Sequence, residues 1–269
     1  MSEESVPQVF SNRWGDAAGS GGHGSFRDLC RCIEPVHTRP QAPTRFHPER
    51  QDTATSGWIR LLELVEEAAA DRREEFKPLV ELTAEQRRQV VTLPATITKL
   101  TSVKHLVLYG SNLVRIPPEI GAMKSLEEFT PYTSYRLHWF PYEITRCPNL
   151  RYSTVSTRAL YGNYKTRPPF PPLSASATLD ARDVDRDNLD PGVWGADAIR
   201  TCSACDRRVE IVNLRQVWIS LRTSGADILP LLVNACSTAC LEALPNPAEG
   251  YVATPHAGGP GIDQPTTRR

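Results

Sequence analysis

The sequence predicts an α/β fold in which a short solenoid of stacked repeats, with a helical cap at its N-terminal end, is followed by a small α+β module. The first observation is a period. An apolar residue followed by proline recurs after 23 and then 24 residues, at Leu93-Pro94, Ile116-Pro117 and Phe140-Pro141. Units of this length cannot bury an apolar face alone and must stack on one another. The second observation is that four of the seven cysteines form two close pairs.

The amino-acid composition limits the classes of protein to which this chain can belong. The chain has 269 residues, 40% of them hydrophobic, and a mean hydropathy of -0.37. The longest apolar run, residues 228–233, is too short to cross a bilayer, and the N-terminus lacks the pattern of a signal peptide. We therefore expect a cytoplasmic protein with no membrane partner. Lysine plus arginine equals aspartate plus glutamate at 31 each, which makes nucleic acid an unlikely partner.

Residues 1–55 are rich in glycine, proline, threonine and arginine and show no sustained apolar period, so we expect disorder. Cys30 and Cys32 lie near His23 and His37. No scaffold surrounds them, and a loose tail is favoured over a metal site.

Residues 56–91 predict the helical cap. Trp58, Leu61 and Val65 follow helical spacing behind the candidate N-cap Ser56, and this helix should run to about residue 75. A second helix is indicated by the capping-box sequence that starts at Thr83.

Residues 92–173 contain the repeats. The most complete unit reads Val103-x-x-Leu106-x-Leu108-x-x-Ser111-x-Leu113-x-x-Ile116-Pro117-x-x-Ile120. It resembles a leucine-rich repeat of bacterial type, with Ser111 at the usual asparagine position. The next unit carries one inserted residue and has Pro131 where an apolar strand residue is expected. The prolines of 167–173 end the stack, because proline cannot donate a ladder hydrogen bond.

The register of such repeats predicts a concave surface. Leu106 and Leu108 face the core, so the residues that alternate with them face outward. Three rows result: His105, Glu128 and Tyr152; Val107, Thr130 and Thr154; Tyr109, Tyr132 and Ser156. Aligned tyrosines with polar neighbours suit a protein-binding surface, and packing against flanking loops is the alternative.

Two further features of the repeats predict burial. The loop 132–142 is unusually aromatic, which indicates a secondary core or an interaction site, and we favour the core. Cys147 occupies the position of Leu100 and Met123 in earlier units and should be a small buried apolar residue. Residues 174–198 have the composition of a linker.

Residues 199–250 contain the cysteine module. Cys202-x-x-Cys205 and Cys236-x-x-x-Cys240 flank two candidate strands at 208–212 and 216–221, and the last cysteine leads into a short helix. This order resembles a treble-clef zinc module. The sequence of the second cysteine pair is also similar to that of FCS-type zinc fingers. Ala235 departs from their pattern, because an aromatic residue is usual at that position. The tail 251–269, rich in proline and glycine, should be extended or disordered.

Four thiolates satisfy Zn²⁺ tetrahedrally and leave no position for water, so one structural zinc ion is expected. Two disulfides or free thiols are less favoured in a chain without a secretion signal. Iron–sulfur ligation also uses four thiolates and stays open.

The motifs of the common enzyme classes are missing from the sequence, which has no G-x-S-x-G, no Walker loop and no H-E-x-x-H. We therefore expect a non-catalytic platform that binds another protein. The alternatives are a nucleic-acid-associated zinc finger scaffolded by the repeats and an accessory subunit of a ubiquitin-ligase-like or other enzyme complex.

Overall fold

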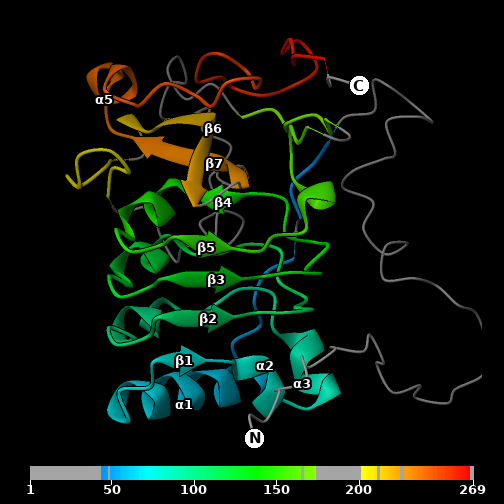
Figure 1. Ribbon diagram of the computed structural model, residues 1–269, viewed down its shortest axis with the longest axis vertical. Coiled ribbons are helices and arrows are strands. Elements are labelled where there is room, and N and C mark those ends of the chain that lie inside the picture. Colours follow the sequence, from blue (N-terminus) through cyan, green and yellow to red (C-terminus); the bar gives the residue numbers. More distant parts are fainter. Residues whose placement is uncertain are drawn as a thin grey trace, which may run out of the picture.

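The computed structural model describes residues 44–47, 49–164, 167–173, 201–210, 213–224 and 227–266. The expectations for residues 1–43 and for the linker 174–198 lie outside these residues. The described chain is a mixed α/β structure with two sheets, of strand order β1-β2-β3-β5 and β4-β7-β6. Figure 1 shows helix α1 at one end of the stacked strands and the β6–β7 hairpin at the other.

The N-terminal cap contains three helices, α1 (Ser56–Ala70), α2 (Pro78–Glu81) and α3 (Ala84–Gln89). Four residues of α1 face the core and are buried: Leu61, Leu64, Val65 and Ala68. The capping box before α3 is confirmed, because the Thr83 side chain and the Gln86 side chain each accept a backbone N–H from the other residue.

Helix α1 ends five residues earlier than expected. The N–H groups of Arg72 and Arg73 donate to the carbonyls of Ala69 and Ala68, which is the Schellman arrangement of a helix end. Arg72 has a φ of 53°, a left-handed value for which glycine is the usual residue. The chain then turns into a strand, β1 (Glu75–Phe76), that the sequence analysis missed.

The first sheet is parallel, with strands β1, β2 (His105–Val107), β3 (Glu128–Thr130) and β5 (Tyr152–Ser153). The 3-10 helices η2 (Ala95–Lys99), η3 (Pro118–Ala122), η4 (Tyr142–Arg146) and η5 (Thr157–Ala159) return the chain between and after them. The recurring Pro94, Pro117 and Pro141 are the N-cap residues of the first three, which explains the proline period.

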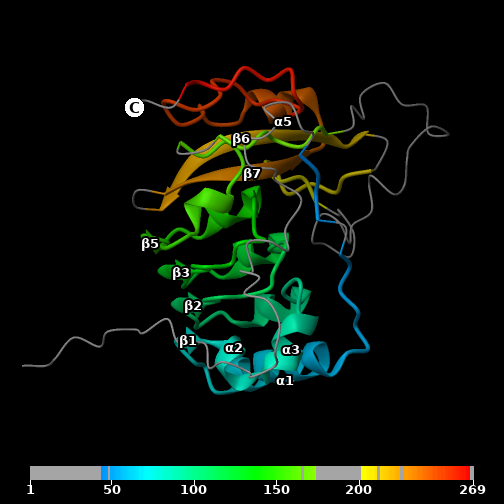
Figure 2. The same ribbon diagram turned by 90° about the vertical axis from the view of Figure 1, so that its right-hand side faces the viewer.

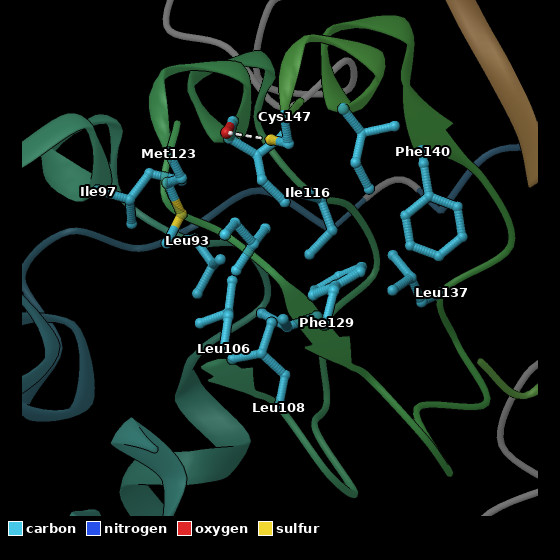
Figure 3. Close-up of a cluster of buried hydrophobic side chains, with 14 of the residues drawn as sticks. Leu93, Ile97, Leu106, Leu108, Ile116, Met123, Phe129, Leu137, Phe140 and Cys147 are labelled. Carbon is cyan, nitrogen blue, oxygen red and sulfur yellow. Dashed lines mark hydrogen bonds between the residues drawn. The ribbon is translucent and has the colours of Figure 1, made fainter. Parts of the chain in front are cut away.

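The recurring apolar residues fill one continuous core between the strands and the 3-10 helices (Figure 3). Leu106 and Phe129 point inward from neighbouring strands and are fully buried. Cys147 is buried as predicted. Its thiol donates to the Ile120 carbonyl at 3.3 Å, and burial raises its pKa to about 11.

A serine pair stands where leucine-rich repeats usually place asparagine. The Ser111 and Ser134 hydroxyls lie 2.6 Å apart, and Ser134 donates onward to the Leu108 carbonyl. The Ser111 N–H also donates to the Ser134 hydroxyl. Both serines are buried, and the pair adds side-chain hydrogen bonds to the Ser111 N–H and the Leu108 carbonyl, which also bond each other across the turn.

The second sheet contains the hairpin of β6 (Arg215–Ser224) and β7 (Asp227–Ala235), and β4 (Phe140–Pro141) pairs with β7 in parallel. The partner of the strand expected at 216–221 is therefore the apolar run 228–233, whereas Arg208, in the described part of the candidate strand 208–212, forms an isolated bridge with Thr201. An apolar run of this kind is typical of a strand buried on both faces. Leu231 packs in the repeat core, and Leu232 packs on the opposite side against Trp218.

The aromatic loop 132–142 contributes mostly to the interior, as favoured. Leu137, Trp139 and Phe140 are buried, whereas Tyr132 is 45% exposed. Trp139 joins a second apolar cluster around Trp218 that also contains Tyr161, Phe170, Leu173 and Leu232. Among the described helices, none has the length and apolar composition needed to span a membrane.

We expect Arg72→Gly to raise the free energy of unfolding by about 0.5–1 kcal/mol. Left-handed backbone costs a non-glycine residue about 1–2 kcal/mol, and the greater freedom of glycine in the unfolded chain offsets about 0.5–1 kcal/mol of the gain. Urea unfolding of the purified variant measures the change. Arg72→Ala is the matched control, because it keeps the strain, and an equal gain in both variants would contradict the explanation.

Candidate metal centre and concave face

The four predicted ligand cysteines come together at the end of the molecule that carries the hairpin. Cys202 and Cys205 lie on one turn, Cys236 directly follows β7, and Cys240 lies in helix α5 (Thr238–Glu242). Their sulfur atoms all lie within 4.8 Å of one another. The Cys236 Sγ atom lies 3.6 Å from the Sγ atom of Cys205 and 3.6 Å from that of Cys240.

Local backbone structure holds both cysteine pairs. In the first, the Cys202 N–H donates to the Arg207 carbonyl and the Asp206 N–H donates to the Cys202 carbonyl, which closes a tight turn. In the second, the Ser237 hydroxyl caps α5 by accepting the Cys240 N–H. The Cys236 N–H points at the Cys202 sulfur at 3.4 Å and thereby links the two pairs.

The donor set fits a soft tetrahedral cation. Ligand sulfurs about 2.3 Å from Zn²⁺ lie roughly 3.8 Å apart at a tetrahedral angle, close to the separations found here. Hydrogen bonds with Cys205 and, to a smaller extent, with Cys240 raise the pKa of the Cys236 thiol to about 12. Four thiolates so close together repel one another unless a cation compensates their charge.

The cysteine turn is anchored to the last repeats by a buried polar network. The Ser203 hydroxyl donates to Glu143 Oε1 at 2.7 Å, and the Asn234 N–H donates to Ser203. Arg146 donates to the carbonyls of Cys202 and Ser203. Burial raises the pKa of Glu143, and the hydrogen bond from Ser203 offsets only part of this effect. Sequence reasoning missed Glu143, because its partner lies 60 residues away.

The predicted concave rows follow the register of the sheet. His105 pairs with Glu128 and Glu128 with Tyr152, while Val107 pairs with Thr130. The four strand residues in the middle are half-buried: His105, Val107, Glu128 and Thr130. Four other residues of the predicted rows are exposed: Tyr109, Tyr132, Tyr152 and Thr154.

Two of the tyrosines form a pair on this surface. The rings of Tyr109 and Tyr132 lie 5.9 Å apart at 39°, and their side chains are 38% and 45% exposed. Strand β1 adds a position to the first predicted row, because Glu75 pairs with His105. The alternation of Glu75, Phe76 and Lys77 is the signal that identifies this strand.

No family model matches the chain. It is 32% identical over 121 residues to a protein described as a leucine-rich repeat protein soc-2 homolog from Drosophila erecta, and 32% identical over 111 residues to the corresponding protein of Drosophila ananassae. The alignments cover 44% and 40% of this chain but only 18% and 17% of the relatives. The chain thus spans less than a fifth of the length of the curated relatives it matches.

A solved leucine-rich repeat protein from Leptospira interrogans is 25% identical over 29% of this chain and 20% of its own length, with a TM-score of 0.23. The curated relatives support leucine-rich repeats in this chain, and the bacterial type of the repeats stays a prediction.

We expect Glu143→Gln to make the protein more stable than wild type at pH 7 and to flatten part of its pH dependence. A raised pKa means that the folded state holds a proton that the unfolded state releases above about pH 4.5, so wild-type stability falls as the pH rises from there. Glutamine keeps an acceptor for Ser203 without titrating. Urea unfolding at pH 5 and pH 7 measures both proteins.

Glu143→Ala is the control for the hydrogen bond, because it removes the acceptor together with the charge. A difference between wild type and Glu143→Gln that is the same at both pH values would show that Glu143 is ionised in the folded protein.

Proposed function

We propose that this protein is a non-catalytic platform whose concave sheet binds another protein, with a structural zinc ion that holds the hairpin end together. The observation that carries the proposal is the exposed pair of Tyr109 and Tyr132, aligned on neighbouring repeats. Tyrosine is enriched at the centres of protein interfaces, because it buries a large ring and keeps a polar hydroxyl. Tyr152 and Thr154 extend the same surface, and the leucine-rich relatives agree with a repeat scaffold.

The zinc proposal rests on Cys202, Cys205, Cys236 and Cys240. Four cysteines complete the coordination of Zn²⁺, so the ion would stabilise the fold and would leave no site for a substrate. Their order along the chain, a turn, a hairpin and then a helix start, supports a treble-clef-like module. Intact thiols require a reducing compartment, and we therefore propose the cytoplasm.

Charge around the cysteines favours protein over nucleic acid as the partner. The hollow beside them is lined by Arg207 and Arg208 but also by Glu210, and Asp206 forms an ion pair with Arg146 at 2.6 Å. Nucleic-acid surfaces concentrate positive charge in one patch. This mixed surface supports the protein-binding proposal over the zinc-finger alternative.

We expect about one zinc ion per chain in protein purified without added metal, measured by elemental analysis. Cys236→Ser should lose the metal and lower the thermal transition, because three thiolates hold Zn²⁺ less tightly. Cys147→Ala is the matched control, since it removes a cysteine outside the cluster and should keep the zinc. A thermal transition that does not change when a chelator removes the metal would refute a structural role.

We expect Tyr109→Ala combined with Tyr132→Ala to abolish partner capture while it leaves the fold nearly intact, because both tyrosines lie at the surface and neither is part of the buried core. Pull-downs with isotope-labelled lysate and mass spectrometry compare the double variant with wild type. Tyr164→Ala is the control, because Tyr164 is 51% exposed but lies outside the three predicted rows. Recovery of the same partners by the double variant would exclude the concave face as the binding surface.

A further inference from the structure

The C-terminal tail packs along the outer edge of the hairpin. Figures 1 and 2 show it, in orange to red, at the end of the molecule opposite to helix α1. The Trp218 N–H donates to the His256 carbonyl at 2.8 Å, and the His256 N–H donates back to the Trp218 carbonyl at 3.1 Å. Because β6 is the last strand of its sheet, this bridge covers backbone groups that an edge strand would otherwise leave open.

The proline-rich segment that ends the repeats holds the tail from a second side. The Leu173 N–H donates to the Ala257 carbonyl at 2.7 Å, and the Gly259 N–H donates to the Phe170 carbonyl at 2.9 Å. We call residues 256–259 the clasp, because their backbone is bound both to β6 and to the proline-rich segment.

The side chain of His256 lies inside the clasp. His256 is 8% exposed, and its ring packs edge-on against Phe170 with 4.6 Å between centroids. The Gly258 N–H donates to His256 Nδ1 at 3.1 Å, whereas Nε2 is buried and has no hydrogen-bond partner among the described residues. Gly258 has a φ of 72°, and a β-carbon on it would lie 2.2 Å from the Pro171 carbonyl oxygen. The turn that carries the acceptor contact is therefore tightly packed.

These contacts determine the protonation state of His256. A backbone N–H only donates, so Nδ1 must hold a lone pair, and the neutral ring carries its hydrogen on Nε2. A second proton can bind only at Nδ1, where it would face the Gly258 N–H. Protonation would therefore break this hydrogen bond and place a charge in a buried site, which is costly without a compensating partner. His256 is neutral while the clasp is closed.

No charged group in the described residues stabilises a protonated His256. The charged and titratable groups on the elements that pack against it are Arg167 in the proline-rich segment, Arg215 and Arg222 in β6, and Glu249, Tyr251 and Asp263 in the tail. None of them hydrogen-bonds the His256 ring, and Arg167 instead donates to the Gly250 carbonyl and lies over the Tyr251 ring. Burial alone lowers the pKa of His256 from its ordinary value of 6.5 to about 4.

We propose that the clasp is a pH-sensitive device, which holds the C-terminal tail on β6 while His256 is neutral and releases the tail when His256 takes up a proton. The released tail binds a proton that the closed clasp excludes. Closure is therefore most favourable above about pH 6.5 and weakens as the pH falls from there towards about 4. Release uncovers the outer edge of β6 at Trp218 and the ring of Phe170, which are buried in the closed form.

Hydrogen exchange of the full-length protein tests the clasp. After correction for the intrinsic pH dependence of exchange, the clasp should open about twentyfold more readily at pH 5 than at pH 7, because the released His256 gains a proton near pH 6.5 and the closed form only near pH 4. Peptides from β2 and β3 report any general loss of stability at pH 5. Corrected protection of the clasp that is equal at both pH values, or that falls only as much as in β2 and β3, overturns the proposal.

His256→Asn separates the proton from the contact. An asparagine side-chain oxygen accepts the N–H of the residue two positions on, here Gly258, and asparagine does not titrate. Clasp protection in this variant should fall between pH 7 and pH 5 no more than that of β2 and β3. His105→Asn is the matched control, because it removes a half-buried histidine from β2 and should keep the wild-type response of the clasp. A clasp response of wild-type size in His256→Asn overturns the proposal.

Nitrogen-15 histidine NMR observes the ring directly in the wild type, with the signal assigned by its absence from His256→Gln. At pH 5.5, in protein whose clasp is still protected from exchange, we expect a neutral His256 with its hydrogen on Nε2 and a bare Nδ1. An imidazolium at that pH in the protected protein would overturn the proposal. So would a neutral ring with its hydrogen on Nδ1, because Gly258 could not then donate to it.

Discussion

The parallel pairing of β4 with β7 is the interaction on which the rest of the structure depends. A stack of parallel repeats ends in a strand whose backbone groups and apolar face lack a neighbour. Here β5 has only two residues, and the alignment of Phe140 with Leu231 brings the hairpin over the open end of the core. The hairpin also delivers Cys236 and Asn234 to the turn that carries Ser203. The repeats are therefore closed by a segment that begins about 40 residues beyond them.

Features with local causes were predictable from the sequence. The proline period, the capping box at Thr83 and the burial of Cys147 each depend on residues within one repeat or one turn. Strand β1 was missed because Arg72 ends helix α1 without the glycine that usually marks such a turn. The partner of β6 was missed because strand pairing depends on which apolar run reaches the repeat core, and periodicity along the chain does not contain that information.

The same distinction applies to the candidate sites. The cysteine cluster was predictable, because metal ligands come in close pairs whose spacing has a chemical reason. The concave rows were predictable from the alternation of side chains along a strand. The contact of Glu143 with Ser203 and that of His47 with His138 join residues 60 and 91 positions apart. Both contacts form only in the tertiary structure, where folding brings each titratable side chain next to a polar partner.

The two faces of β7 connect the proposed sites in different ways. One face packs in the repeat core beside the cysteines, and the other packs through Leu232 on the aromatic cluster against which Phe46 also packs. Loss of the proposed metal would loosen the attachment of the hairpin to the repeats and leave the packing of the aromatic cluster on the other face of β7 in place. Among the tyrosines of the predicted rows, Tyr152 lies in β5, and Tyr109 and Tyr132 lie in the turns just after β2 and β3. The register of this sheet is set by pairing among β1, β2, β3 and β5. The proposed partner binding there should therefore depend on the hairpin only through the stability of the last repeat.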